Sequence, residues 1–507
     1  MREIDRNKRV MYNSMANGIY QIVLLTSGLI LPRFILMAFG SAYNGLVTSL
    51  MQFLGITEIL TMGLAGAARA ELYQSLAYRD IKRTSGIIKM ISRYMYKAAG
   101  VFIIYMLVLL FIYPKFTQND FTFPEIASLI IIIGFGNIVT YVCGYAYNVL
   151  LDADNAVYIY TCLKIVLTLV NVFVSILLIK CGQSIQVVKL ASGLILAIAP
   201  LCLFLIVPKL YKLDKTVPVD DSWKKNQRYA AANSIALIVH DNTDAVLLTI
   251  FTSTKIVSVY SIYYLVIKGL KGILGIFTTS MEPLFGNMWA NREYKEMENT
   301  LTHYEFFIGF FISVSLSSAL ALILPFVSLY TKGVTDVEYV LPLFAFLTIM
   351  AELVRCIRIP YLTVVQAAGK YKETQIAAFV EAGLNITISI ALTSRFGLIG
   401  VIIGTLFANL YRTVSYSNYV SKCVLPRSMK HTFKLLAWTL FNILLNSKIF
   451  GIICAAIGLS ITSWGTWIIG AIIVVSISLI EVLLTSLLFY QESFKWLKKF
   501  VGRYFTK

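Results

Sequence analysis

AELVRCIRIPYL, residues 351–362, carries Glu352, Arg355 and Arg358 inside an otherwise apolar stretch. The three-residue spacing aligns these charges along one face of a helix, and Pro360 removes a backbone hydrogen bond and predicts a kink. Because a charge near the centre of a bilayer costs roughly 2.5 kcal/mol or more on insertion scales, a membrane helix keeps one only where it faces a partner, water or a substrate path. The stretch therefore predicts a kinked membrane helix whose polar face is either paired or functional.

The rest of the chain has the composition of a polytopic helical membrane protein. Of its 507 residues, 58% are hydrophobic and 14% charged, and the mean hydropathy is +0.76, against roughly 45–50% apolar and 25% charged residues in soluble domains. The apolar runs are continuous and far longer than the roughly 10 residues of a barrel strand. They predict an all-α fold with about fourteen transmembrane helices, at 15–38, 45–68, 94–114, 125–150, 157–179, 187–208, 229–251, 256–288, 304–330, 339–366, 374–394, 396–418, 433–458 and 464–490.

A basic, proline-containing segment between the sixth and seventh predicted helices is expected to be a cytoplasmic linker. A faint echo between Tyr12–Asn17 and Tyr229–Asn233 points to two parallel repeats of six helices, related by an axis along the membrane normal. The predicted parts are an N-terminal six-helix bundle (1–208), the linker (209–228), a C-terminal six-helix bundle (229–420), two additional transmembrane helices (433–490) and a basic cytoplasmic tail (491–507).

Lysine and arginine are distributed unevenly between alternate loops, which predicts the topology. Most of the 44 basic residues fall on one side of the membrane, and this asymmetry supports both termini in the cytoplasm. Much of the formal charge of +18 is therefore a topology signal, and we expect basic stretches such as 79–97 to meet anionic lipid head groups rather than nucleic acid. The charged opening and the long first apolar run do not fit a cleavable signal peptide.

Cysteine and histidine offer no metal or cofactor motif. The seven cysteines show no CxxC spacing, and His240, His303 and His431 stand in no HExxH frame. We therefore expect no metal site and no cofactor.

A second pair of cations lies in YLVIKGLKGILG, residues 264–275, where Lys268 and Lys271 are again three residues apart. From about mid-depth a lysine reaches water only if a cavity comes to it, which favours a cavity role for both. The glycines at 269, 272 and 275 fit the alternative, in which this face packs closely against another helix.

Acidic residues come from VHDNTDAVLL, residues 239–248, in which Asp241 and Asp244 are three residues apart. This pair could bind a coupling cation or carry a proton. It could equally pair with Lys268, Lys271 or Arg33, and the sequence leaves both interpretations open.

Two interpretations also remain for residues 351–362. Glu352 can neutralise Arg355 and fasten this helix to a neighbour, or the surplus cation can face a cavity, where planar guanidinium groups suit phosphate oxygens. Over all the predicted helices positive charge exceeds negative charge, which favours an anionic cargo. The cations are Arg33, Lys164, Lys268, Lys271, Arg355, Arg358 and Arg412, and the acids are Glu58, Asp241, Asp244, Glu352 and Glu381.

Two stretches resemble a known family. PYLTVVQAAGKYKETQIAAFVEAGLNITISIALTSRFGLIGVIIGTLFANLYR, from Pro360 to Arg412, is similar to the later helices of polysaccharide flippases in the MATE-like MOP superfamily, with a GKYKE turn, Glu381, Asn385 and an FGLIGVIIGT turn. DAVLLTIFTSTKIVSVYSIYYLV, from Asp244, is similar to the seventh and eighth helices of the same group.

The resemblance implies a Wzx-type flippase of the bacterial cytoplasmic membrane, which is not an enzyme. Such proteins move undecaprenyl-pyrophosphate-linked oligosaccharide units through a central cavity between two six-helix bundles, for capsule, O-antigen or exopolysaccharide assembly. H+ or Na+ as coupling ion, membrane lipids and glycan polymerases are the expected partners. The implied cavity residues that bind the anionic cargo are Arg33, Lys268, Lys271, Arg355, Arg358 and Arg412, and the residues for ion coupling or charge pairing are Asp241, Asp244, Glu352 and Glu381.

Other functions rank lower. A lipid II flippase is second, because the related flippases share the cationic cavity and two extra helices, whereas Arg33 finds no match there. A MATE-type cation-coupled exporter is third, since cationic drugs favour an acidic lumen. A glycan polymerase or ligase commonly needs a sizeable outer loop, and the longest outer connection is YPKFTQNDFT, residues 113–122. A channel or scaffold needs no such charged helix faces.

Overall fold

The chain is a multi-pass, all-helical membrane protein. The computed structural model describes residues 6–61, 64–117, 120–214, 216–218, 238 and 242–495, and every regular element in these ranges is a helix. Eleven of the described helices are long and apolar enough to cross a membrane. The predicted all-α polytopic fold is confirmed.

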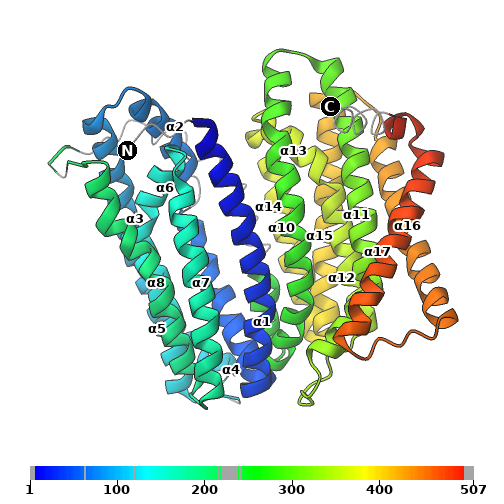
Figure 1. The fold of residues 1–507 in the computed structure, drawn as a ribbon, viewed down its shortest axis with the longest axis horizontal. Helices are drawn as coiled ribbons and strands as arrows, with labels where there is room; N and C mark the ends of the chain where they lie inside the picture. The colour runs from blue at the N-terminus through cyan, green and yellow to red at the C-terminus, as the bar shows by residue number, and fades with distance from the viewer. Residues whose placement is uncertain are drawn as a thin grey trace. The chain divides into compact units, whose positions relative to one another are not determined.

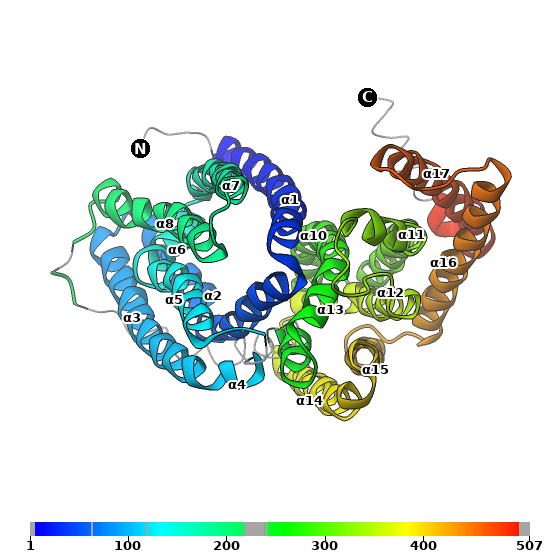
Figure 2. The same ribbon diagram turned by 90° about the horizontal axis from the view of Figure 1, so that it is seen from below.

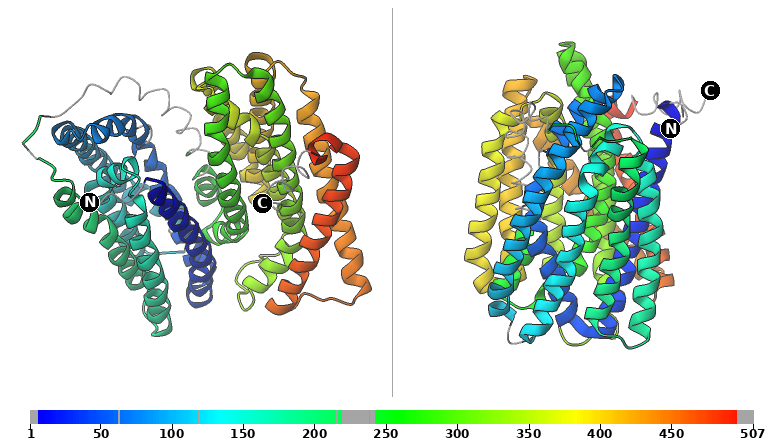
Figure 3. Two further views of the ribbon diagram at one scale, coloured as in Figure 1. Left: turned by 45° about the horizontal axis from the view of Figure 1, so that its top comes forward. Right: turned by 90° about the vertical axis from the view of Figure 1, so that its left-hand side faces the viewer.

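The chain divides into two compact units, residues 1–258 and 259–507. In the first unit α1 lies along α7, α7 along α8, and α8 along α5 (Figure 1; Figure 3, right). A further described helix, Asn242–Phe251, follows them. The elements are α1 Arg6–Gly55, η1 Ile56–Thr61, α2 Leu64–Ala77, α3 Ile81–Ile112, α4 Pro114–Thr117, α5 Phe123–Val139, η2 Thr140–Gly144, α6 Tyr145–Ala153, α7 Val157–Lys180 and α8 Ile185–Leu210.

In the second unit α15 packs against α14 and α12, and α11 packs against α12, α16 and α17. The last two helices lie at the edge of this unit, against α11 (Figure 2). The elements are α10 Thr254–Ala290, whose first turn still belongs to the first unit, α11 Tyr294–Tyr330, α12 Pro342–Ile357, α13 Ile359–Ala367, α14 Tyr371–Phe396, α15 Leu398–Tyr419, η4 Val420–Val424, α16 Lys430–Ala456 and α17 Trp464–Phe489.

Three local features separate the predicted fourteen helices from the eleven counted. The first two predicted helices belong to a single element, α1, whose backbone departs from helical geometry at Gly40 (φ 80°, ψ 178°). Glycine adopts this conformation readily. The seventh is described only as the short helix Asn242–Phe251. The tenth is divided into α12 and α13 at Arg358, two residues before Pro360, which is the kink that the sequence predicts.

Close helix packing in the second unit depends on glycine. A Cβ atom on Gly400 would lie 2.4 Å from the carbonyl carbon of Leu392, and one on Gly404 would lie 2.1 Å from Oγ of Ser389. Both glycines are on α15 and face α14, four residues apart, so they present one smooth strip. The glycines of the FGLIGVIIGT stretch therefore allow α14 and α15 to pack closely against each other.

The predicted domain boundaries remain predictions. Residues 219–228 of the predicted linker and 496–507 of the predicted tail lie outside the described residues. The predicted central cavity is a relation between the two units and likewise stays a prediction.

Candidate functional site

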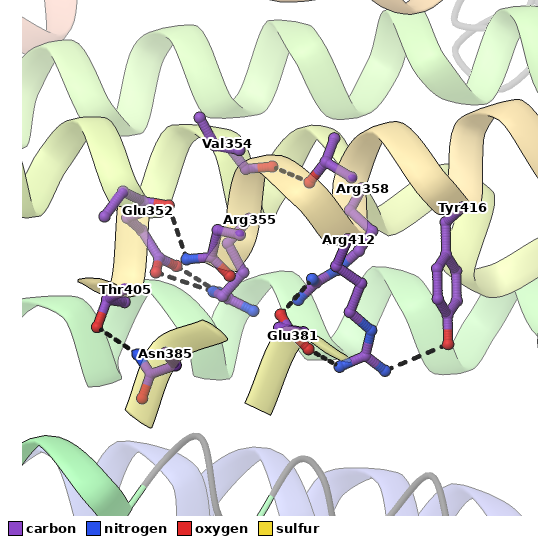
Figure 4. Close-up of polar contacts among 12 residues, drawn as sticks. Glu352, Val354, Arg355, Arg358, Glu381, Asn385, Thr405, Arg412 and Tyr416 are labelled. Atoms are coloured by element: carbon purple, nitrogen blue, oxygen red, sulfur yellow. Dashed lines mark hydrogen bonds and ion pairs between the residues drawn. The ribbon is translucent and has the colours of Figure 1, made fainter. Parts of the chain in front are cut away.

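A buried network of one glutamate and two arginines joins three helical segments of the second unit (Figure 4). The Glu381 carboxylate of α14 accepts a hydrogen bond from Nη1 of Arg358 at 2.7 Å, and its other oxygen accepts one from Nη1 of Arg412 on α15. Nη2 of Arg412 also donates to the Tyr416 hydroxyl at 3.2 Å. The exposed fractions are 0% for Glu381, 4% for Arg358 and 1% for Arg412.

The position of this network follows from the break ahead of Pro360. Because the helix is interrupted at Arg358, that side chain lies at the junction of α12 and α13, where it reaches α14. Buried charges are tolerated only when they are paired and hydrogen-bonded, and one carboxylate here serves two guanidinium groups. The network carries a surplus positive charge within the unit.

A second pair lies one turn earlier on α12. Nε of Arg355 donates to Oε2 of Glu352 at 2.8 Å, and Nη2 of Arg355 donates to Oε1, as Figure 4 shows. Glu352 is buried, whereas the Arg355 side chain is 19% exposed. The pairing of Glu352 with Arg355 that the sequence offered as one interpretation is present, between residues one turn apart on α12.

Of the two lysines on α10, one lies near this pair and the other is exposed. Lys271 is half-buried, and its ammonium nitrogen lies 5.3 Å from the centre of the Tyr264 ring. It is also within electrostatic range of Glu352. Lys268, one turn earlier, is exposed. We call Lys268, Lys271 and Arg355 the α10–α12 cationic cluster, and its side chains remain partly accessible.

The other predicted residues lie in the first unit. Arg33 is half-buried on α1, and Asp244 is 5% exposed in helix Asn242–Phe251. Asp241 lies outside the described residues. The predicted pairing of the two aspartates with the α10 lysines joins the two units and stays a prediction.

Sequence reasoning missed two buried acids. Glu305 of α11 accepts a hydrogen bond from Nη2 of Arg427 at 2.6 Å, with both side chains less than 5% exposed. Glu481 of α17 is 6% exposed. Each was visible as a charge inside a predicted apolar segment. The partner of Glu305 could not be predicted, because Arg427 lies in a loop that is distant in the sequence.

The second unit also contains a cavity of about 520 Å3 at the shared ends of α11, α16 and α17. Its lining includes three basic residues, Lys430, His431 and Lys434, and one acid, Glu492. Among the residues that the structure describes, no three His, Cys, Asp or Glu side chains gather as a metal site.

Comparison with known proteins identifies the fold. No family model and no curated protein matches the sequence. Solved structures do match: the lipid II flippase MurJ in an inward closed conformation has a TM-score of 0.62 and 14% identity, with 95% of this chain and 99% of that chain covered.

Two further structures match over most of their length. The Vibrio cholerae MATE transporter VcmN has a TM-score of 0.56 and 15% identity over 83% of this chain and 98% of its own. A MOP superfamily transporter from Pyrococcus furiosus, described as having a binding pocket of reverse polarity that suggests a different function, has a TM-score of 0.55 and 12% identity over 81% of this chain and 94% of its own. The chain therefore has the fold of MOP superfamily transporters.

Proposed function

We propose that this protein is a flippase that moves undecaprenyl-pyrophosphate-linked oligosaccharide repeat units across the bacterial cytoplasmic membrane by alternating access. The observation that carries the proposal is the α10–α12 cationic cluster on a transporter fold. Lys268, Lys271 and Arg355 are three partly accessible cations on two neighbouring helical faces of the second unit, so a polyanion can bind to them. Arginine and lysine are the usual partners of phosphate oxygens in proteins.

The buried arginines take a different role in this proposal. Arg358 and Arg412 are bound to Glu381 and nearly inaccessible, so they position α12, α14 and α15 and add positive potential behind the cluster. Of the predicted cavity residues in the second unit, the three members of the cluster contact the diphosphate. Arg33 supplies a further cationic contact from the first unit.

The mechanism follows from the chemistry of the cargo. The lipid tail stays in the bilayer while the polar head crosses a cavity between the two bundles, and rocking of the bundles opens that cavity to each side in turn. The cluster replaces part of the water around the diphosphate, which lowers the cost of carrying its charge through the membrane. Asp241 and Asp244 bind the coupling H+ or Na+, and a glycan polymerase receives the product. The protein forms and breaks no covalent bond, so it is not an enzyme.

Two observations rank the alternatives. The lipid II flippase covers 95% of this chain whereas the Vibrio cholerae MATE transporter covers 83%, which favours a lipid-linked cargo over a free drug. Lipid II is therefore the second candidate, because it shares the diphosphate and the lipid tail. A cation-coupled exporter of cationic drugs is third, since such a cargo would be repelled by the cluster.

Deletion of the gene followed by analysis of membrane lipids tests the proposal. We expect a lipid-linked oligosaccharide to accumulate in the inner leaflet, and the wild-type gene to clear it. The Lys271→Gln/Arg355→Gln variant should fail to clear it, whereas Lys448→Gln, which removes an exposed lysine of α16, should succeed. Accumulation of lipid II alone would support the second candidate. Unchanged lipids with altered drug export would overturn the proposal.

A further inference from the structure

Glu481 is a lone acid in the second half of α17, the last described membrane helix. It is the one charged residue in the sequence of α17, Trp464–Phe489, and it is 6% exposed. Both of its carboxyl oxygens are buried, and neither meets the geometry of a hydrogen bond. A charge in such a place requires a partner or neutralisation.

The neighbouring polar group is the Asn446 side chain of α16. Asn446 is fully buried, and its amide oxygen and nitrogen also lack aligned hydrogen bonds. The amide nevertheless lies within hydrogen-bonding reach of the Glu481 carboxyl. Four polar atoms, two on each side chain, therefore face one another in an unsatisfied state.

The packing of α11, α16 and α17 places this pair in a defined layer. One turn away, Oγ1 of Thr485 donates to Oδ1 of Asn442 at 2.8 Å, and Nδ2 of Asn442 donates to Oγ of Ser313 at 3.5 Å. One helical turn away from these three residues, the corresponding positions are Glu481 on α17, Asn446 on α16 and the buried residue Ser317 on α11. The side chains of Thr485, Asn442 and Ser313 are joined by hydrogen bonds. Those of Glu481, Asn446 and Ser317 have polar atoms without a hydrogen-bond partner.

Apolar residues close both ends of the two layers. Leu322, Phe450 and Val474 form a buried cluster on the far side of Glu481. On the other side, the Trp438 ring centre lies 5.9 Å from that of Phe306 and 4.8 Å from that of Tyr490. The Glu481 carboxyl therefore lies between two groups of packed apolar and aromatic side chains.

No cation among the described residues balances Glu481. The sequence of α11 from residue 306 to its end contains no charged residue, and the sole charge of α16 beyond its first two turns is Lys448, which is exposed. An ionised carboxylate here would be a buried charge without a cationic partner among the described residues, which strongly disfavours the ionised form.

We propose that Glu481 and Asn446 form a proton-binding site within the two additional helices. The protonated carboxyl donates its O–H to Oδ1 of Asn446, and its carbonyl oxygen accepts one N–H from Nδ2 of Asn446. These two hydrogen bonds satisfy all four facing atoms with one bound proton. An ionised carboxylate would satisfy fewer, because Oδ1 of Asn446 would then face an acceptor. The site is independent of the transported cargo.

Infrared spectroscopy of the purified, full-length protein in lipid at neutral pH tests the proposal. A neutral carboxylic acid has a carbonyl band that is separate from the carboxylate bands and shifts in heavy water. We expect Glu481→Gln to lose such a band, and Glu492→Gln, which removes an exposed acid beyond the end of the same helix, to retain it. Asn446→Leu should keep the band and shift it to higher frequency, since the two hydrogen bonds are lost.

Thermal unfolding supplies a second measurement in the same samples. Glutamine reproduces the shape and charge of the protonated acid, so Glu481→Gln should unfold at the same temperature as the wild type. A spectrum that Glu481→Gln leaves unchanged would overturn the proposal. Stabilisation of the wild type by Na+ that Glu481→Gln abolishes would also overturn it, because the carboxylate would then hold a metal cation.

Discussion

Replacing Glu381 with glutamine should destabilise the second unit more than replacing either arginine that it binds. The carboxylate contacts Arg358 and Arg412, and all three side chains are at most 4% exposed. Each ion pair is worth on the order of 4 kcal/mol at a separation of about 4 Å and an effective dielectric constant of about 20. Removing one partner of a buried pair typically costs about 3–5 kcal/mol. We therefore expect Glu381→Gln to lose at least that much free energy of unfolding.

The asymmetry between acid and base makes the prediction specific. Arg412→Gln leaves one arginine and one glutamate, which still form a neutral pair, whereas Glu381→Gln leaves two buried cations that repel each other. Arg412→Gln should therefore cost less. The double variant Glu381→Gln/Arg412→Gln should cost less than the two single losses added together, because residues in one ion-pair network couple.

Denaturant unfolding in mixed micelles, followed by tryptophan fluorescence, measures these differences. Glu373→Gln is the matched control, since it makes the same substitution on the same helix in an exposed pair with Lys370 at 3.6 Å. Such a pair contributes about 0.3–0.5 kcal/mol. If Glu381→Gln and Glu373→Gln were equally stable, the buried network would not hold the helices together, and the reasoning would be refuted.

Three further predictions concern close helix packing and a second buried ion pair. Gly404→Ala puts a Cβ atom 2.1 Å from Ser389 and should cost about 1–3 kcal/mol of unfolding free energy, whereas Gly383→Ala on α14 meets nothing within 4 Å and should be neutral in the same unfolding assay. Gly45→Ala, whose Cβ would lie 1.7 Å from a backbone oxygen of α10, should lower the melting temperature, and an unchanged value would contradict the described contact. Arg427→Met leaves its buried acidic partner on α11 unpaired and should cost about 3–5 kcal/mol, measurable by the same denaturant titration.

Much of the fold could be predicted from the sequence, because length and hydropathy determine where a chain can cross a membrane. The break at Arg358 was predictable from Pro360, since proline removes a backbone hydrogen bond. The interruption at Gly40 was not. Glycine is tolerated within a helix as well as outside one, and its unusual φ depends on the contacts that surround it.

The site was less predictable, because ion pairs depend on tertiary contacts. Glu352 and Arg355 are three residues apart on one helix, so their pairing could be offered as an interpretation. Glu381 lies 23 residues from Arg358 and 31 from Arg412, and nothing local to it specifies either partner. The sequence placed these charges within predicted membrane helices, but it could not show that one acid binds two of the cations in the interior of the unit.

The environment of Glu481 could not be predicted from the sequence for a different reason. As a lone acid in an apolar run it had no charged neighbour at helical spacing, so it formed no motif. Its environment became apparent only when α11 and α16 brought asparagine and serine side chains to the same layer.

Reconstituted flipping of a fluorescent undecaprenyl-pyrophosphate-linked oligosaccharide in liposomes tests the proposed function most directly. Wild-type protein should transfer the lipid to the opposite leaflet faster than protein-free vesicles do. Loss of one charge-assisted phosphate contact, worth about 1.4 kcal/mol or more, should slow Lys271→Gln and Arg355→Gln about tenfold, and Lys448→Gln should match the wild type. A wild-type rate no faster than empty vesicles, or full activity in both cluster variants, would contradict the account.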